Sequence, residues 1–297
     1  MAEKYINPHT DFGFKRLFGS EFNKELLISF LNAMFHGEQN VQDVTYLNSE
    51  QLGDRVDARR AIFDVYCEND KGEKFIVEMQ NVYQEFFKDR TIYYSTFPIR
   101  EQAPKESDWN FCLKKVYVVA LLNYKMSDEA FDSTDTIHTI ALMDTKTNKV
   151  FNAKLMFKYV EVGRFDKTDE ELTSLSDKWM YVLKNLSRLD NRPSSLREKI
   201  FTKLFDAAAI ARFSPNELRE YEDSLKAYRD IKNSLDTAKE EGRAEGREEG
   251  RAEGREEGRA EGIAMVAKMM YAKGIDVDVI ASMTGMAIDK IKALCRQ

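Results

Sequence analysis

The feature that most constrains this chain is a charged four-residue repeat over residues 240–262, each copy being Glu-Gly-Arg followed by Ala or Glu. Its glycines recur at every fourth position from Gly242 to Gly262, and none of its side chains is large and apolar. Each glycine costs about 1 kcal/mol relative to alanine inside a helix. A segment without an apolar face cannot enter a core. We therefore expect a charged connector, extended or partly helical, between two parts of the chain.

The spacing of the glycines leaves a second interpretation open. At intervals of four they stack in one ridge of a helix, and such a ridge would let two copies of the helix approach closely. Ion pairs such as Glu248–Arg251 and Glu256–Arg259 would return only ~0.2–0.5 kcal/mol each to that helix. The repeat is thus either a solvated connector or a stalk through which the chain forms a homo-oligomer.

Composition and charge exclude several classes of protein. The 297 residues are 43% hydrophobic and 32% charged, enough for one large or two smaller domains with a real core. Three distant cysteines and three histidines argue against a disulfide scaffold or a thiolate or histidine metal site. With neither a membrane-spanning run nor a signal-peptide pattern, we expect a cytoplasmic protein with no membrane contact. At a net charge of −6, contact with nucleic acid requires a local basic patch or a metal.

The pattern before the repeat predicts a mixed sheet flanked by helices, an α/β (α+β) fold. Apolar spacing predicts a short helix at Phe12–Phe18, a longer one capped by Ser20, and an aromatic one around Phe86–Tyr94 that Pro98 should end or kink. Strand signals lie at Val44–Leu47, Arg60–Glu68, Lys74–Asn81, Lys115–Leu122, Thr136–Met143 and Lys154–Val162. We predict four parts: a domain at 1–165, a helical region at 166–237, the connector at 238–262 and a small helical tail at 263–297.

Two of these strands bring acidic side chains together. They form a predicted hairpin whose loop is Asp70-Lys71-Gly72, with glycine at the position that needs a positive φ. This loop pairs Asn69 with Glu73 and, five residues back on each arm, Asp64 with Glu78. Because side chains alternate along a strand, Gln80 shares a face with Glu78, and Phe63 should share the opposite face with Val65 and Cys67.

Two carboxylates directly opposite each other repel unless a cation joins them. Oxygen ligands of this kind suit Mg²⁺, and a metal so placed could activate water and stabilise charge on a phosphoryl group. The alternative is a solvent-facing strand surface that happens to be acidic. Ile62 and Ile76, predicted on the same face, argue against full solvation.

These residues resemble the PD-(D/E)XK nuclease superfamily, in particular its recombination-promoting nuclease/transposase branch. The matching parts are the Asp11-x-x-x-Lys15-x-x-Phe18 helix with the leucine-rich helix after it, the Asp64 strand, the Glu78-x-Gln80 strand, and the Arg90–Tyr94 helix leading to Val116–Leu122. The resemblance covers residues 5–165, and the Glu-Gly-Arg repeat also recurs in that branch.

The resemblance implies a restriction-endonuclease-like fold and a DNA endonuclease that uses Mg²⁺ or Mn²⁺. Asp64 and Glu78 correspond to the metal-binding carboxylates, and Gln80 to the position usually held by lysine. Phe63 stands where the superfamily has a proline. A lysine would orient the attacking water or stabilise phosphoryl charge, whereas glutamine can donate a hydrogen bond but carries no positive charge.

Three further charged residues each have two interpretations. Lys15 or Arg90 could supply the cation that Gln80 does not, or each could be an ordinary surface charge. Asp11 could add an acidic group to the site, or it could be a first-turn residue favoured by the helix dipole after Thr10.

The tail also has two interpretations. The small–Gly–apolar spacing from Ala281 to Leu294 resembles a helix-turn-helix whose second helix begins near Ala287. That helix carries few basic residues, which favours a compact cap or an oligomerisation element.

We therefore predict an Mg²⁺-dependent DNA endonuclease with a role in recombination, transposition or mobile-element biology. The rival prediction is a catalytically inactive nuclease-like fold that serves as a DNA-binding or protein-interaction module. The acidic pI of about 5.4 and Gln80 favour the rival. The pairing of Asp64 with Glu78 favours the enzyme.

Overall fold

The computed structural model of the protein describes residues 3–51, 61–103, 110–126 and 134–295. The chain divides into two compact units, Met1–Tyr228 and Arg229–Gln297. Arg60, the first residue of one predicted strand, and residues 296–297 of the tail lie outside the described residues. No helix within the described residues combines the length and the apolar character that spanning a bilayer requires.

The first unit is built on a mixed sheet. Six strands of the described chain form it, in the spatial order β1 (Val44–Tyr46), β4 (Val65–Asn69), β5 (Lys74–Gln80), β6 (Val116–Leu122), β8 (Val150–Glu161) and β7 (Ile137–Met143). Strands β5, β6 and β8 are parallel, and the other neighbours are antiparallel. A two-stranded ribbon of β2 (Glu50–Gln51) and β3 (Ala61–Ile62) precedes β4. The predicted α/β (α+β) class with a mixed sheet is confirmed.

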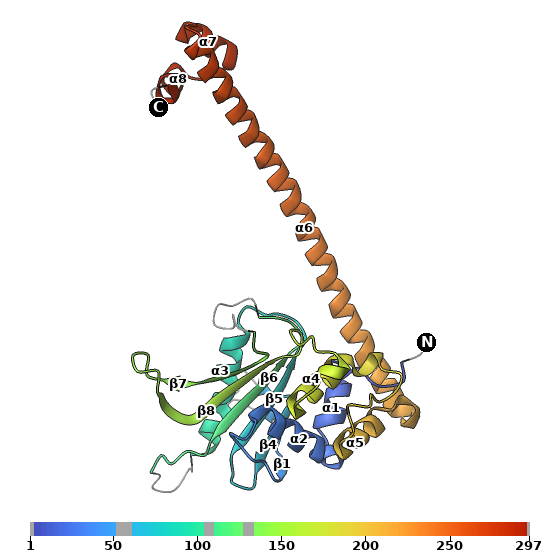
Figure 1. Ribbon diagram of the computed structural model, residues 1–297. Coiled ribbons are helices and arrows are strands. Elements are labelled where there is room, and N and C mark those ends of the chain that lie inside the picture. The colour runs from blue at the N-terminus through green and yellow to red at the C-terminus, as the bar shows by residue number, and fades with distance from the viewer. Residues whose placement is uncertain (1–2, 52–60, 104–109, 127–133, 296–297) are drawn as a thin grey trace. The chain divides into compact units, whose positions relative to one another are not determined.

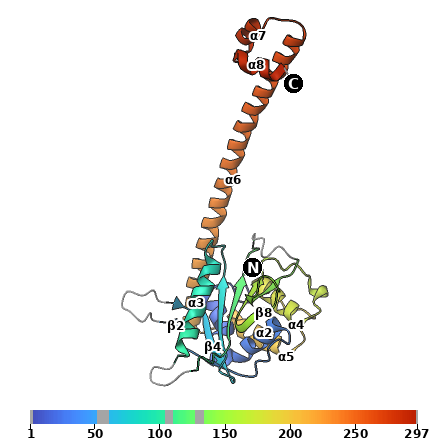
Figure 2. The same cartoon turned by 90° about the vertical axis from the view of Figure 1, so that its left-hand side faces the viewer.

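One face of the sheet is covered by helices from both ends of the unit (Figures 1 and 2). These are α1 (Asp11–Phe18), α2 (Lys24–Phe35), α4 (Leu175–Asn185) and α5 (Lys199–Ala208). Trp179 of α4 is fully buried, with its ring centroid 5.7 Å from those of Phe18 and Phe30 and 5.4 Å from that of Phe201. Residues from 166 onward therefore share a core with the N-terminal helices.

Helix starts in this layer follow from their caps. The Thr10 hydroxyl accepts a hydrogen bond from the Gly13 amide at 3.0 Å and so begins α1. The prediction that Ser20 caps the longer helix is wrong. Ser20 precedes the short 3₁₀ helix η1 (Glu21–Asn23) instead, without a side-chain bond, and α2 starts at Lys24.

The other face of the sheet is covered by α3 (Phe87–Glu101), which Figure 2 shows on the side away from α2, α4 and α5. Its Phe87 and Phe97 pack in a second apolar cluster that includes Tyr66 of β4 and Ile76 of β5. Pro98 was predicted to end or kink this helix; it lies inside the helix, so it does not end it, and the kink stays a prediction. A sheet with apolar layers on both faces leaves its ends as the places where polar side chains can meet.

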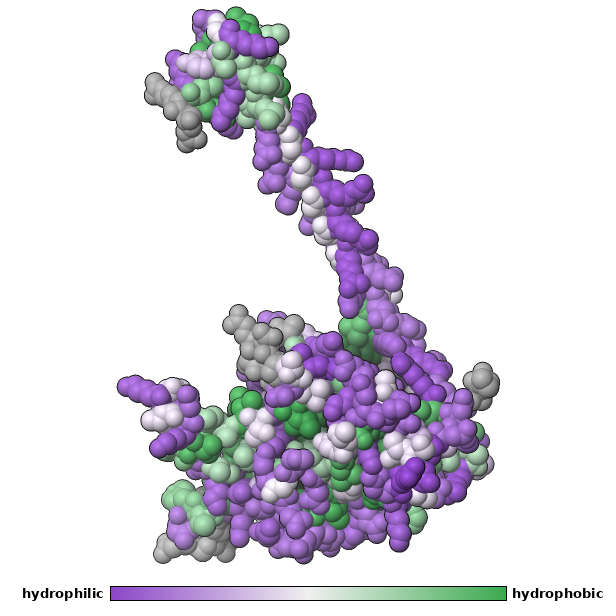
Figure 3. Space-filling model, viewed as in Figure 1, coloured by the Kyte–Doolittle hydropathy of each residue, from purple (hydrophilic) through white to green (hydrophobic). Residues whose placement is uncertain are grey.

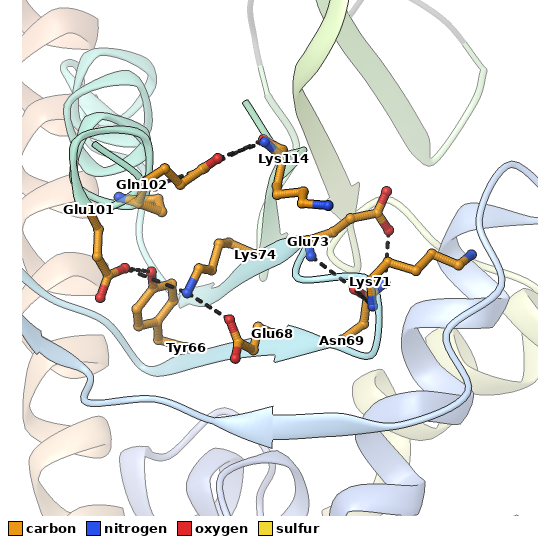
Figure 4. A network of polar contacts seen from close by, with 10 residues as sticks. Tyr66, Glu68, Asn69, Lys71, Glu73, Lys74, Glu101, Gln102 and Lys114 are labelled. Atoms are coloured by element: carbon orange, nitrogen blue, oxygen red, sulfur yellow. Dashed lines mark hydrogen bonds and ion pairs between the residues drawn. The ribbon is translucent and has the colours of Figure 1, made fainter. Parts of the chain in front are cut away.

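The β4–β5 hairpin is held in register by a polar network at its turn (Figure 4). The side-chain oxygen of Asn69 accepts hydrogen bonds from the amides of Lys71 and Glu73, both at 3.0 Å, and its nitrogen donates to the Glu73 carboxylate at 2.8 Å. Gly72 has φ +72°, as the predicted turn requires. The pairs from Val65–Val77 to Glu68–Lys74 confirm the predicted register.

The charged repeat lies in α6 (Pro215–Ala272), a helix of 58 residues that begins in the first unit and continues through the second. The expectation of an extended or partly helical connector is wrong, because the repeat is helical throughout. Its Glu, Arg and Ala residues are good helix formers. The expected pairs Glu248–Arg251 and Glu256–Arg259 do not form in the described chain. The glycines form a pale line along a charged helix (Figure 3), and a Cβ on any of them would meet nothing within 4 Å.

The second unit ends in two short helices, α7 (Val277–Thr284) and α8 (Ile288–Cys295). Gly274 and Gly285, with φ +79° and +70°, punctuate the helices as the sequence predicts. Helix α8 begins one residue after the predicted start. The unit has a small core of Ala267, Ile280 and Ile291. DNA binding by this helix pair stays a prediction.

Alanine at Gly246, Gly250, Gly254 and Gly258 should strengthen α6. The substitutions remove roughly 4 kcal/mol of helix penalty in all, and each Cβ has room in the single chain. For a solvated connector, helicity by circular dichroism and its resistance to heating should rise while the sedimentation coefficient stays unchanged.

If the glycines instead form a contact between two copies, the added methyl groups should force the helices apart and weaken a dimer in sedimentation. The control is the opposite change, Ala244→Gly with Ala252→Gly, which should lower helicity by the same argument.

Candidate active site

The predicted acid pair forms where β4 begins and β5 ends. Asp64 directly precedes β4, and Glu78 lies opposite it in the register that continues from Val65–Val77. The Asp64 amide donates to Oε1 of Glu78 at 3.2 Å, and the Met79 amide donates to Oδ2 of Asp64 at 2.8 Å. Each carboxylate is thus bound to the backbone of the facing strand, so the pair is held by reciprocal hydrogen bonds.

These bonds accompany a bend that the predicted strand did not include. The chain leaves strand geometry at Phe63 and Asp64, between β3 and β4. The prediction that Phe63 shares a face with Val65 and Cys67 is therefore wrong. The Phe63 ring packs 5.3 Å from that of Tyr66, in the layer of α3. Ile76 is fully buried on this face as expected, but Ile62 is 62% exposed.

The acid pair carries negative charge in a poorly solvated place. Glu78 is only 5% exposed. Burial raises the pKa of Glu78 to about 8, and the neighbouring Asp64 charge adds to the shift. Burial also raises the pKa of Asp64, and the charge of Asp11 acts in the same direction. Both pKa values stay raised although the Arg90 charge opposes each shift, so the charge of the pair is not fully compensated by the chain.

Gln80, two residues after Glu78, is 7% exposed and does not turn its amide nitrogen toward the acid pair. Its Nε2 donates to the carbonyl of Val82 at 2.7 Å, and its Oε1 accepts from Nη2 of Arg90 at 2.5 Å. The structure therefore brings Arg90, from α3, directly to the position usually held by lysine.

Three further contacts fix the Arg90 guanidinium. Its Nη1 donates to Oε1 of Gln84 at 2.8 Å, and its carbon lies 4.9 Å from the ring centre of Phe87 and 5.8 Å from that of Tyr94. Its Nε is buried without a partner among the described residues. A guanidinium held on two sides and stacked on aromatic rings is well placed to present a fixed positive charge.

Lys15 lies near the site without joining it directly. Its Nζ is 2.9 Å from the Asp11 carboxylate one turn earlier on α1, and both side chains are more than half exposed. Through space, the Lys15 charge lowers the pKa of Asp64 and the Asp11 charge raises it. The two residues therefore act on the site as a nearly neutral pair, in which Lys15 is mostly occupied by Asp11.

The donor set of the acid pair fits a hard divalent cation. Oδ1 of Asp64 and Oε2 of Glu78 accept no hydrogen bond within the described part of the chain. No group of three or more His, Cys, Asp or Glu side chains that could hold a metal occurs among the described residues. Mg²⁺ commonly uses only one or two protein carboxylates and completes its shell with water and substrate phosphate.

A family model for the PD-(D/E)XK nuclease family transposases matches residues 8–238. The chain belongs to this family. The match includes the acid pair, α3 and the helices packed on the far face of the sheet, and it reaches further than the resemblance over residues 5–165. The repeat from Gly242 onward and the tail lie outside it. No curated protein and no solved structure gives a significant match to the sequence.

Two residues at this PD-(D/E)XK site were not among the predicted site residues, although Tyr94 was expected in the core or the wall of the cleft. Tyr94 has its pKa raised by burial and by the Glu78 charge, which places it beside the acid pair. Its spacing of four from Arg90 on one helix was the available signal. Gln84, which binds Arg90, precedes α3 in a loop, and no spacing points to it.

Glu78→Gln should flatten the pH dependence of stability in metal-free protein. The pKa of Glu78 is raised from 4.5 to about 8 in the folded chain, so the folded state binds more protons than the unfolded state between these values. The free energy of unfolding of the wild type should therefore fall as pH rises through this window. The amide oxygen that the substitution introduces can still accept from the Asp64 amide.

Thermal melts in EDTA across the same pH range measure this effect. Glu85→Gln, which changes an exposed carboxylate, is the control and should follow the wild type. A Glu78→Gln protein with the full wild-type slope would show that Glu78 does not carry the buried proton.

Proposed function

We propose that this protein is a DNA endonuclease whose Asp64 and Glu78 together hold a divalent cation, Mg²⁺ or Mn²⁺. The observation that carries the proposal is the buried cross-strand acid pair, whose negative charge the chain leaves uncompensated. A cation bound there would activate water and neutralise charge on the scissile phosphate.

The chain's own residues support this in two ways. Backbone amides on facing strands fix one oxygen of each carboxylate, so that the other two are held in place without further reorganisation. With its pKa at about 8, Glu78 holds a proton at neutral pH when no cation is present. Cation binding must therefore release that proton, and affinity should increase with pH.

We propose that Arg90 supplies the positive charge that lysine gives in the usual motif, with Gln80 as the residue that positions it. The contact of 2.5 Å between Oε1 of Gln80 and Nη2 of Arg90 supports this assignment. A guanidinium fixed beside the acid pair stabilises negative charge that develops on a phosphate, without moving during the reaction. Lys15, occupied by Asp11, is the weaker candidate.

The second candidate function is an inactive nuclease-like module that binds DNA or protein. One observation favours it: the Gln80 amide nitrogen is used by the carbonyl of Val82 and is not free for a water or phosphate. For the active enzyme we propose a role in transposition, recombination or mobile-element biology, in line with the family name.

Mg²⁺ should raise the melting temperature of the wild type by mass action and should support nicking or linearisation of plasmid DNA, and EDTA should prevent both. Asp64→Asn keeps an acceptor for the Met79 amide but removes a ligand charge, so it should abolish both effects. Glu85→Gln is the control and should behave as the wild type. A full Mg²⁺ response in Asp64→Asn would refute the metal site, and unchanged cleavage would identify a contaminating nuclease.

Arg90→Gln should lower the single-turnover rate of plasmid cleavage by about 10²–10³, the usual loss for one donor to developing charge. The rise in melting temperature with Mg²⁺ should remain, since both carboxylates are intact. Gln80→Lys combined with Arg90→Gln returns a cation to the lysine position and should recover part of the rate. Arg100→Gln, the same change near the other end of α3, should have no effect. Equal rates in Arg90→Gln and wild type would leave the cation to come from elsewhere.

A further inference from the structure

Strands β7 and β8 continue past the sheet as a two-stranded arm. Strand β8 pairs with β6 from Leu155 onward, so its first residues have only β7 as a neighbour. We define the arm as residues 142–154. Every residue in it is exposed, and Figure 1 shows it projecting from the body of the first unit. A lone ribbon of this kind is only marginally stable in water, which suggests that it meets a partner.

The arm is basic in an acidic protein. Lys146, Lys149 and Lys154 are exposed and form no hydrogen bond or ion pair through their side chains within the described residues. The single acid of the arm, Asp144, is used by the turn, where its Oδ1 accepts from the amides of Lys146 and Thr147 at 3.1 and 2.7 Å. Several lysines in the body of the unit are, in contrast, neutralised in ion pairs, as with Lys74, Lys158 and Lys178.

Large apolar side chains accompany these lysines. Leu142, Met143 and Val150 are about half exposed, at 51%, 49% and 51%, and Phe151 is 83% exposed. An apolar partner alone would leave three unpaired lysines at its rim, whereas a polyanion with apolar surfaces between its charges satisfies both kinds of side chain. The major groove of duplex DNA is wide enough for a two-stranded ribbon, and thymine methyl groups offer apolar contacts there.

We propose that the arm of residues 142–154 binds duplex DNA, with its lysines on phosphates and its apolar side chains in the groove. The proposal rests on the proposed function and adds that the substrate is double-stranded. It also provides the local basic patch that an acidic protein needs for nucleic acid.

The strand register gives the distance along the sheet between the acid pair and the arm. Glu78 is level with Tyr159 of β8, through Ala120 of β6. From Tyr159 back to Val150, at ~3.3 Å per residue, the strand covers about 30 Å. At ~3.4 Å per base pair, this length corresponds to about nine base pairs of a duplex that runs along β8.

The test is fluorescence anisotropy on a duplex of about 30 base pairs, with Ca²⁺ in place of Mg²⁺, over a series of salt concentrations. The triple variant Lys146→Gln/Lys149→Gln/Lys154→Gln should bind roughly a hundredfold more weakly at about 0.15 M salt, because each phosphate contact contributes about −0.9 log[salt] to the binding constant. The slope of log K against log salt should fall by about 3.

The matched control is Lys226→Gln/Lys232→Gln/Lys239→Gln, which makes the same charge change on exposed residues of α6 and should leave affinity and slope unchanged. If the triple arm variant does not fold, single Lys→Gln variants decide, each with an expected fall in slope of about one. Wild-type affinity in the arm variants, or an equal loss in the α6 control, overturns the proposal.

The variant Phe151→Ala tests whether the partner of the arm is DNA or a second copy of the chain. We expect weaker DNA binding with an unchanged salt slope, and no change in sedimentation. A dimer that dissociates on this substitution, with DNA binding intact in the lysine variant, would assign the arm to self-association.

The arm proposal and the endonuclease proposal can fail separately. If the lysine variant loses DNA binding but the wild type cleaves no plasmid, the arm is a DNA-binding element and the protein is not an endonuclease. If the wild type cleaves plasmid but the lysine variant binds DNA as well as the wild type does, only the arm proposal is refuted.

Discussion

The register of the β4–β5 hairpin determines which side chains can meet at the end of the sheet. Its turn depends on Asn69, whose side chain accepts from two backbone amides and donates to the Glu73 carboxylate, and on Gly72, which takes a conformation that other residues rarely adopt. A slip of one residue would turn every side chain of β5 to the opposite face. Glu78 would then enter the apolar layer beneath α1 and α2, and the pair with Asp64 would be lost.

At the other end of the hairpin, opposing effects act on the pKa values of Asp64 and Glu78. Burial and mutual repulsion disfavour two ionised carboxylates, while backbone amides and the guanidinium of Arg90 favour them. The first effects are the larger, since the pKa values stay raised. The raised pKa values are therefore a property of the folded chain itself, and they distinguish this pair from two merely adjacent acids.

Local chemistry explains what could be predicted from the sequence. The loop Asp70-Lys71-Gly72 has a defined turn type, so the opposition of Asp64 and Glu78 could be derived from counting. The bend at Phe63 could not be predicted. It depends on the carboxylates of Asp64 and Glu78, which bind backbone amides of the facing strand in place of the regular backbone ladder. The contact of Arg90 with Gln80 joins α3 directly to β5, and no periodicity encodes it. The full helicity of the repeat was missed because the propensity of its Glu, Arg and Ala residues outweighs the glycine penalty.

The line of glycines on α6 winds around the helix, although its members are evenly spaced in the sequence. An α-helix turns about 100° per residue, so four residues advance the line by about 40° beyond a full turn. From Gly242 to Gly262 the line therefore winds through about 200° while rising about 30 Å. Two straight helices lying side by side could bring only two or three of these glycines into contact. Any self-association through the line is thus confined to a short crossing, and most of the helix would remain surrounded by water.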